Sequence, residues 1–189
     1  MSDRVRVWCL RHAESEANAE VAGAGNDSRL TARGRDQAID AARELAAEQI
    51  TGIYCSTALR ARQTAEILAT APDRPGLRVT AMPELVEADV RAAVLRAWVV
   101  EQDLGRLAAD GETGHQVVAR VTAAFETIVG AHLGGTVAVV DHVASLTLAL
   151  GRLCSLGPGV WGTPLPYARP FLVEWDGQAW HCPAWPAVG

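Results

Sequence analysis

Short runs rich in β-branched residues alternate with longer segments of helical periodicity along the chain. The clearest strand is Thr136–Val140, whose composition is typical of a central strand buried on both faces. The clearest helix is Thr31–Glu48, in which Thr31 is a suitable N-cap and alanine and leucine form an apolar stripe. Repeated strand–helix units predict an α/β layered fold with a mainly parallel sheet.

The same patterns predict the remaining elements. Further strands are expected at Arg4–Leu10, at Ile50–Cys55 and, as an edge strand, at Leu77–Ala81. Further helices are expected at Ala58–Thr70, Asp89–Leu107, Thr113–Leu133 and Val143–Leu156. Phe171–Trp175 and Ala179–Cys182 flank a turn at Asp176-Gly177 and predict a hairpin. No repeat or linker interrupts the series, so we expect one domain over residues 1–189.

Composition narrows the classes of function. Of the 189 residues, 49% are hydrophobic, and the formal net charge is −5, which argues against a general nucleic-acid or anionic-membrane binder. All 17 basic residues are arginine, which excludes lysine Schiff-base chemistry and a Walker-type phosphate loop. The four cysteines show no C-x-x-C spacing, and neither a signal core nor a membrane-spanning run is present. We therefore expect a cytoplasmic protein.

Basic and imidazole side chains follow three of the predicted strands. Arg11 and His12 follow the first strand, Arg60 opens the helix after the second, and Asp141 and His142 follow the buried strand at Thr136–Val140. Ligands of open α/β sheets bind beyond the carboxyl ends of the strands, where helix N-termini add oriented N–H donors. The sequence therefore predicts an anion pocket in which histidine can act as nucleophile, acid or base.

Six motifs, in order, resemble the signature of the histidine phosphatase superfamily, the phosphoglycerate mutase-like proteins. Arg11-His12-Ala13-Glu14-Ser15 with Asn18 is similar to R-H-G-x-[ST]-x-x-N. The others begin at Leu30 (L-T-x-x-G-x-x-Q-A), Ser56 (S-x-L-x-R-A-x-Q-T-A), Leu85 (L-x-E) and Gly111 (G-E-[ST], with Arg120), and end with the histidine His142. The resemblance covers nearly the whole chain and implies a three-layer αβα sandwich of the phosphoglycerate mutase-like type.

The resemblance also implies roles for single residues. His12 would be the nucleophile that becomes phosphohistidine. Arg11, Arg60 and His142 would hold the phosphoryl oxygens and stabilise charge in the transition state. Glu87 would protonate the leaving oxygen and then help to activate water. The further phosphate-binding residues would be Ser15 and Asn18. No metal and no cofactor would be needed, because the guanidinium groups supply the positive charge.

Several positions leave alternatives open. Ala13 and Val143 stand where the family usually has glycine, and Val143 would be crowded if its backbone needed a positive φ. Asp141 is atypical before the second histidine, and would either hold His142 as a cation or only cap the following helix. The general acid is assigned to Glu87 by the L-x-E match, with Glu84 as the alternative.

The favoured activity is a metal-independent phosphomonoester phosphatase acting on a small phosphorylated metabolite with an apolar or sugar-like body. A short Glu87–Gly111 segment favours an open site and hydrolysis over a phosphoglycerate-type mutase, which is the second reading. The third is a non-catalytic phosphate-binding regulatory module. Trp98, in the same segment, would contact either the substrate or the core. The expected partner is the metabolite, with no nucleic acid and no membrane, and a homodimer is left open.

Overall fold

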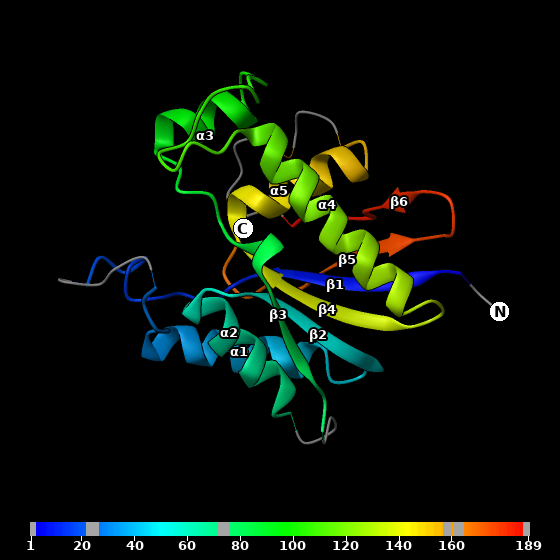
Figure 1. Cartoon of the computed structure of the whole chain (residues 1–189). Helices are drawn as coiled ribbons and strands as arrows, with labels where there is room; N and C mark the ends of the chain where they lie inside the picture. The colour runs from blue at the N-terminus through cyan, green and yellow to red at the C-terminus, as the bar shows by residue number, and fades with distance from the viewer. Residues whose placement is uncertain (1–2, 22–26, 72–75, 157–159, 161–164, 187–189) are drawn as a thin grey trace.

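A six-stranded sheet forms the centre of the molecule, with helices on both faces (Figure 1). The computed structural model describes residues 3–21, 27–71, 76–156, 160 and 165–186. The strand order is β3-β2-β4-β1-β5-β6. β1 (Val5–Arg11), β2 (Ile50–Ser56), β3 (Val79–Met82) and β4 (Thr136–Asp141) run parallel, whereas β5 (Phe171–Trp175) and β6 (Trp180–His181) form the antiparallel hairpin. The expected α/β fold with a mainly parallel sheet is thus confirmed.

Each face of the sheet has its own core. α1 (Ala32–Glu44) and α2 (Leu59–Ala69) cover one face, and α4 (Gly114–Ala131) and α5 (Val143–Leu153) cover the other, with α3 (Ala92–Val99) beyond α5 (Figure 1). β4 contributes to both cores, Val137 and Val139 on the α4 side and Ala138 and Val140 on the α1 side. It is therefore the doubly buried central strand that its sequence predicts.

Most helix ends agree with the sequence signals. Thr31 caps α1 by accepting a hydrogen bond from the Gly34 N–H, and Thr113 forms a capping box with Gln116 at the start of α4. Within the described ranges, no helix combines the length and apolar character that crossing a membrane requires.

The helix expected over Asp89–Leu107 is much shorter than predicted. α3 covers only Ala92–Val99, because Arg91 is extended and Gln102 has a left-handed backbone with φ of 58°. The chain then folds back, and the Trp98 indole Nε1 donates to the Arg106 carbonyl at 2.7 Å. Trp98 is fully buried in the core on this side of the sheet, which favours the core-packing alternative over substrate contact.

Candidate active site

Three strand ends bring the predicted site residues together. β4 lies between β1 and β2, so the junctions after these strands are neighbours at one edge of the sheet. The ring centroids of His12 and His142 are 5.0 Å apart. Arg60, in the first turn of α2, bonds both rings: its Nε lies 3.1 Å from His12 Nε2 and its Nη2 3.3 Å from His142 Nδ1. The arrangement is the one expected from the order of strands and motifs.

The hydrogen bonds of His12 define its tautomer. Its Nδ1 lies 2.8 Å from the Ala13 carbonyl oxygen, which can only accept, so Nδ1 carries the proton. Nε2 faces the Nε–H of Arg60, which can only donate, so Nε2 presents a lone pair. His12 is therefore neutral, with an unprotonated nitrogen directed at the cluster of basic groups.

His142 has the opposite tautomer for the same reason. Its Nδ1 accepts from Arg60, so Nε2 carries the proton and donates to the Ser56 hydroxyl oxygen at 2.8 Å. Ser56 is fully buried and also accepts from the Ala58 N–H at 3.2 Å. His142 thus has its ring orientation fixed from two sides by side chains that come from β2 and α2.

Burial and positive charge keep both imidazoles neutral. Desolvation, with smaller contributions from Arg60 and Arg11, lowers the pKa of His12 from 6.5 to about 3. Desolvation, the neighbouring His12 and Arg60 also lower the pKa of His142 well below its ordinary value. The site therefore contains two neutral imidazoles beside two guanidinium groups at neutral pH.

The loop that carries His12 is held by α1 and α2. The Ala13 N–H donates to the Thr64 hydroxyl oxygen at 3.1 Å, and the Glu14 N–H donates to Gln37 Oε1 at 2.9 Å. Gly34 passes so close that a Cβ built on it would lie 2.0 Å from the Glu14 carbonyl oxygen. Three residues of the motifs that begin at Leu30 and Ser56, namely Gly34, Gln37 and Thr64, therefore fix the backbone beside His12.

Ser15 and Asn18 are bonded to each other. The buried Ser15 hydroxyl donates to Asn18 Oδ1 at 2.8 Å, and the Ser15 N–H lies 3.3 Å from the same oxygen. Because the amide oxygen is used in this way, the amide nitrogen of Asn18 is the group that can donate to a ligand. Ser15 thereby sets the orientation of Asn18.

Of the two candidate acids, Glu87 is the one whose carboxylate contacts α5, the helix that follows His142. Its Oε2 and Oε1 accept the N–H groups of Ala144 and Ser145, each at 3.1 Å, in the first turn of α5. Desolvation raises the pKa of Glu87, although these hydrogen bonds oppose the change. Glu84 is exposed, and it is its backbone carbonyl that accepts from Arg120.

Asp141 organises the backbone after β4 and does not touch the imidazole ring. Its Oδ1 accepts from the His142 N–H at 2.8 Å and from the Ser145 hydroxyl at 3.0 Å. Neither expected role is therefore seen: Asp141 does not hold the ring, and the first-turn N–H groups of α5 are accepted by Glu87 and not by Asp141. Burial raises the pKa of Asp141 well above its ordinary value. Val143 is the first residue of α5 and has a helical backbone, so the crowding expected at a positive φ does not arise.

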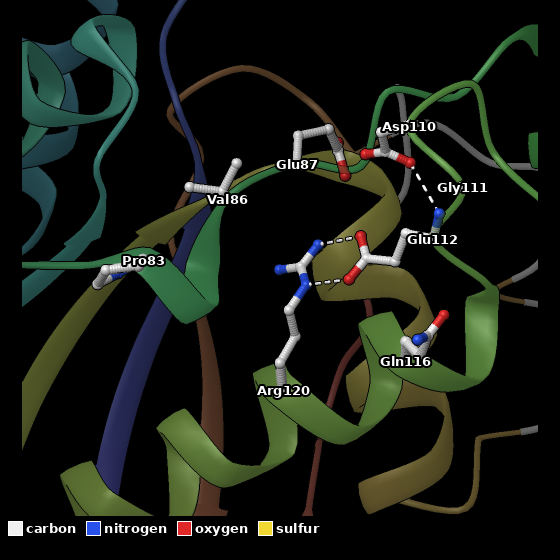
Figure 2. A pocket seen from close by; sticks show the side chains of 8 residues that line it. All are labelled: Pro83, Val86, Glu87, Asp110, Gly111, Glu112, Gln116 and Arg120. Carbon is white, nitrogen blue, oxygen red and sulfur yellow. Dashed lines mark hydrogen bonds and ion pairs between the residues drawn. The ribbon is translucent and has the colours of Figure 1, made fainter.

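A cavity of about 420 Å³ opens beside Glu87 (Figure 2). Its wall includes Arg120, which reaches from α4 to bond both oxygens of Glu112 at 2.6 and 2.9 Å. Figure 2 shows this pair below Glu87, with Pro83 and Val86 on the opposite wall. Glu112 and Arg120, the charged residues of the motif that begins at Gly111, thus form a structural ion pair in the wall of this cavity.

Two contributors were not predicted from the sequence. Tyr167 stacks on Arg11, with the Arg11 Cζ 3.8 Å from the ring centroid, and Ser145 links Asp141 to Glu87. No motif or spacing marks Tyr167, which lies far from Arg11 in the sequence. Among the described residues, no group of three or more histidine, cysteine, aspartate or glutamate side chains has a geometry suited to a metal ion.

Comparison with known proteins identifies the family of the chain. The profile of the family described as "Histidine phosphatase superfamily (branch 1)" matches residues 7–187. The "Probable phosphoglycerate mutase GpmB" of Citrobacter koseri is 30% identical over 200 residues, covering 96% of this chain and 90% of that protein. The GpmB of Salmonella arizonae is 32% identical, covering 83% and 77%.

Solved structures show the same fold. YhfR of Bacillus stearothermophilus superposes with a TM-score of 0.82 at 25% identity, covering 98% of both chains. A mycobacterial glucosyl-3-phosphoglycerate phosphatase superposes with a TM-score of 0.75 at 24% identity, covering 98% of this chain and all (100%) of that one. The phosphoglycerate mutase-like architecture expected from the motifs is thereby confirmed.

Proposed function

Because the chain belongs to the histidine phosphatase superfamily (branch 1), we propose that it is a phosphomonoester phosphatase whose nucleophile is His12. The observation that carries this proposal is the state of His12. It is buried and neutral, its Nδ1–H is held by the Ala13 carbonyl, and its Nε2 lone pair faces Arg60. A nucleophilic imidazole needs this unprotonated nitrogen, and a phosphoryl group needs the adjacent cations.

In the first step, His12 Nε2 attacks phosphorus, the N–P bond forms and the P–O ester bond breaks. Arg60 and Arg11 donate to the equatorial oxygens, with Asn18 as a further donor. The neutral His142, whose one N–H is donated to Ser56, accepts from Arg60 through Nδ1 and so orients that guanidinium. The leaving oxygen takes a proton from Glu87, whose raised pKa favours the protonated form that this step needs. The first product leaves as an alcohol, and the phosphoryl group stays on His12.

In the second step, a water molecule attacks the phosphohistidine. Its oxygen bonds to phosphorus, its proton passes to the Glu87 carboxylate, and the N–P bond breaks to release inorganic phosphate and neutral His12. Glu87 thus returns to its starting protonation state. The cavity beside Glu87 supplies room for the body of a small phosphorylated metabolite next to the proton donor.

The phosphohistidine is the test of this function. We expect rapid quench with a ³²P-labelled phosphate ester to trap an acid-labile, base-stable label on the wild type. His12→Ala should fold, lose the label and lose at least ~10³-fold in turnover. His115→Ala removes an exposed histidine outside the site and is the matched control. Full activity of His12→Ala, or label on a serine, would overturn the mechanism.

Metal independence follows from the same proposal. The arginines supply the charge that a divalent ion supplies in many phosphatases. Turnover should therefore survive dialysis against EDTA. Activity that disappears in EDTA and returns with magnesium or zinc would contradict an arginine-based site.

A phosphoglycerate-type mutase is the second candidate, favoured by the names of the GpmB relatives. A mutase returns the phosphoryl group from histidine to a bound glycerate, whereas a phosphatase passes it to water. Incubation with 3-phosphoglycerate separates the two. Formation of 2-phosphoglycerate faster than inorganic phosphate would favour the mutase, and release of phosphate alone would favour the phosphatase.

A further inference from the structure

Arg11 is held by a segment from the far end of the chain. Tyr167 forms a parallel bridge with Arg11, and the Ala168 N–H donates to the Arg11 carbonyl at 3.0 Å. Arg11 Nη1 donates to the Leu165 carbonyl, also at 3.0 Å. Ala168 has a left-handed backbone with φ of 46°, which is unfavourable for a residue with a Cβ. The loop therefore holds this arrangement against a conformational cost.

The tyrosine ring covers one face of the guanidinium. Arg11 Cζ lies 3.8 Å from the Tyr167 ring centroid, and the same ring is 6.2 Å from the His12 ring, measured between centroids. The N–H groups of a guanidinium lie in its plane, so a ring on its face does not compete for them. Within the described residues, the buried Nε of Arg11 has no hydrogen-bond partner. Stacking thus fixes the plane and leaves donors for a ligand.

Arg11 also needs support because Arg60 is close. Two guanidinium groups in one pocket repel each other before a phosphate arrives, and a flexible arginine would turn away towards water. The negative face of an aromatic ring stabilises a cation without adding a competing acceptor or a full negative charge. Tyr167 provides that face from a half-buried position beside the nucleophile.

We propose that Tyr167 is a positioning residue, which acts through Arg11 by holding the guanidinium plane in the orientation that binds the phosphoryl oxygens. The proposal rests on the function proposed above for this site. It assigns the positioning to the ring face of Tyr167. Desolvation lowers the pKa of Arg11 and a side-chain hydrogen bond to Tyr167 opposes this change, so removing the hydroxyl alone separates the contributions of the ring and the hydroxyl.

The first test compares ring removal with hydroxyl removal. Tyr167→Leu should weaken vanadate and inorganic phosphate binding by about tenfold, whereas Tyr167→Phe should stay within about twofold of wild type. Tyr54→Leu removes a half-buried tyrosine whose hydroxyl bonds His132, which is not one of the site residues, and should leave both affinities unchanged. Urea unfolding shows which variants are folded. Equal effects of Tyr167→Leu and Tyr167→Phe, or none in either, would overturn the proposal.

A second test does not depend on the fold of Tyr167→Leu. Phenylalanine carrying increasing numbers of fluorines at position 167 keeps the ring shape but weakens its negative face. Affinity for phosphate should fall stepwise with fluorination. In an Arg11→Ala background the series should be flat, because the partner cation is gone. A flat series in the wild-type background, or the same slope without Arg11, would contradict the proposal.

Failure of the proposed function gives a different result. An enzyme that binds vanadate but turns over no phosphate ester and traps no phosphohistidine would refute the phosphatase proposal, and the fluorine series would still report on Tyr167. A wild type that binds neither vanadate nor phosphate would refute both proposals.

Discussion

The neutral state of His12 predicts that the protein loses stability as the pH falls through the usual range of histidine. The unfolded chain binds a proton on His12 near its ordinary pKa of 6.5, whereas burial lowers the pKa in the folded chain to about 3. Between these two values the unfolded state holds the additional proton, so the free energy of unfolding decreases as the pH decreases. His12→Gln removes this titration.

The size of the effect follows from the two pKa values. At pH 5, about 1.5 pH units below 6.5, the folded His12 is still neutral, and its contribution to the loss of stability is about 2 kcal/mol relative to pH 7.5. Only 3% of the His12 side chain is exposed, so screening by solvent does not reduce this value. The lowered pKa of His142 also makes the free energy of unfolding decrease at low pH, both in wild type and in His12→Gln.

Urea unfolding at pH 7.5, 6.0 and 5.0 in phosphate-free buffer measures the difference. The free energy of unfolding of wild type should fall by about 2 kcal/mol more than that of His12→Gln over this range. His115→Gln, in which an exposed imidazole is lost, should follow wild type. Parallel pH dependences in wild type and His12→Gln would refute the neutral, buried His12, and with it the observation that carries the proposed function.

Three further predictions concern the loop, the core and the acid. Gly34→Ala should lower the free energy of unfolding by about 1–3 kcal/mol in urea, because a Cβ would meet the Glu14 carbonyl at 2.0 Å, whereas Gly130→Ala, with open space around it, should not destabilise. Trp98→Ala should cost about 3–5 kcal/mol without changing substrate ranking in a phosphate-ester panel, and Val100→Ala, 51% exposed, should be nearly neutral. Glu87→Gln should lower kcat strongly for alkyl phosphates and less for nitrophenyl phosphate, whose leaving group needs no proton. The same selective loss in Glu84→Gln, and not in Glu87→Gln, would contradict the assignment of Glu87.

The convergence of the site could be predicted because it follows from strand order and chain direction. A histidine or arginine just after a parallel strand has only one edge of the sheet to occupy, so His12, Arg60 and His142 had to be near one another. The central strand and the capped helices were likewise determined by local pattern. Prediction from local sequence pattern was wrong where tertiary contacts determine the backbone conformation, as in the helix expected over residues 89–107. There Trp98 turns inward, and the chain bends at Gln102 to follow it.

The contacts of Tyr167 and Leu165 that hold Arg11 could not be predicted from the sequence. The hydrogen bond from Arg11 to Leu165 joins residues 154 positions apart, and no periodicity or motif connects them. Asp141 is a second case, because an aspartate before a helix gives the same signal whether it holds a ring or caps a backbone. The structure shows that it does neither: it bonds the His142 N–H and the Ser145 hydroxyl, while Glu87 accepts the first-turn N–H groups of α5.

Burial is the largest cause of the protonation pattern that the proposed reaction needs. Removing water disfavours the charged form of every titratable group, so it lowers the pKa of His12 and His142 and raises the pKa of Glu87 and Asp141. A guanidinium keeps its charge under the same conditions. Desolvation, reinforced at the histidines by the neighbouring arginines, thus leaves a neutral nucleophile, favours a protonated acid and keeps two cations for an incoming phosphate dianion. The absence of lysine from the chain fits this arrangement, because a buried ammonium group gives up its proton far more readily than a guanidinium.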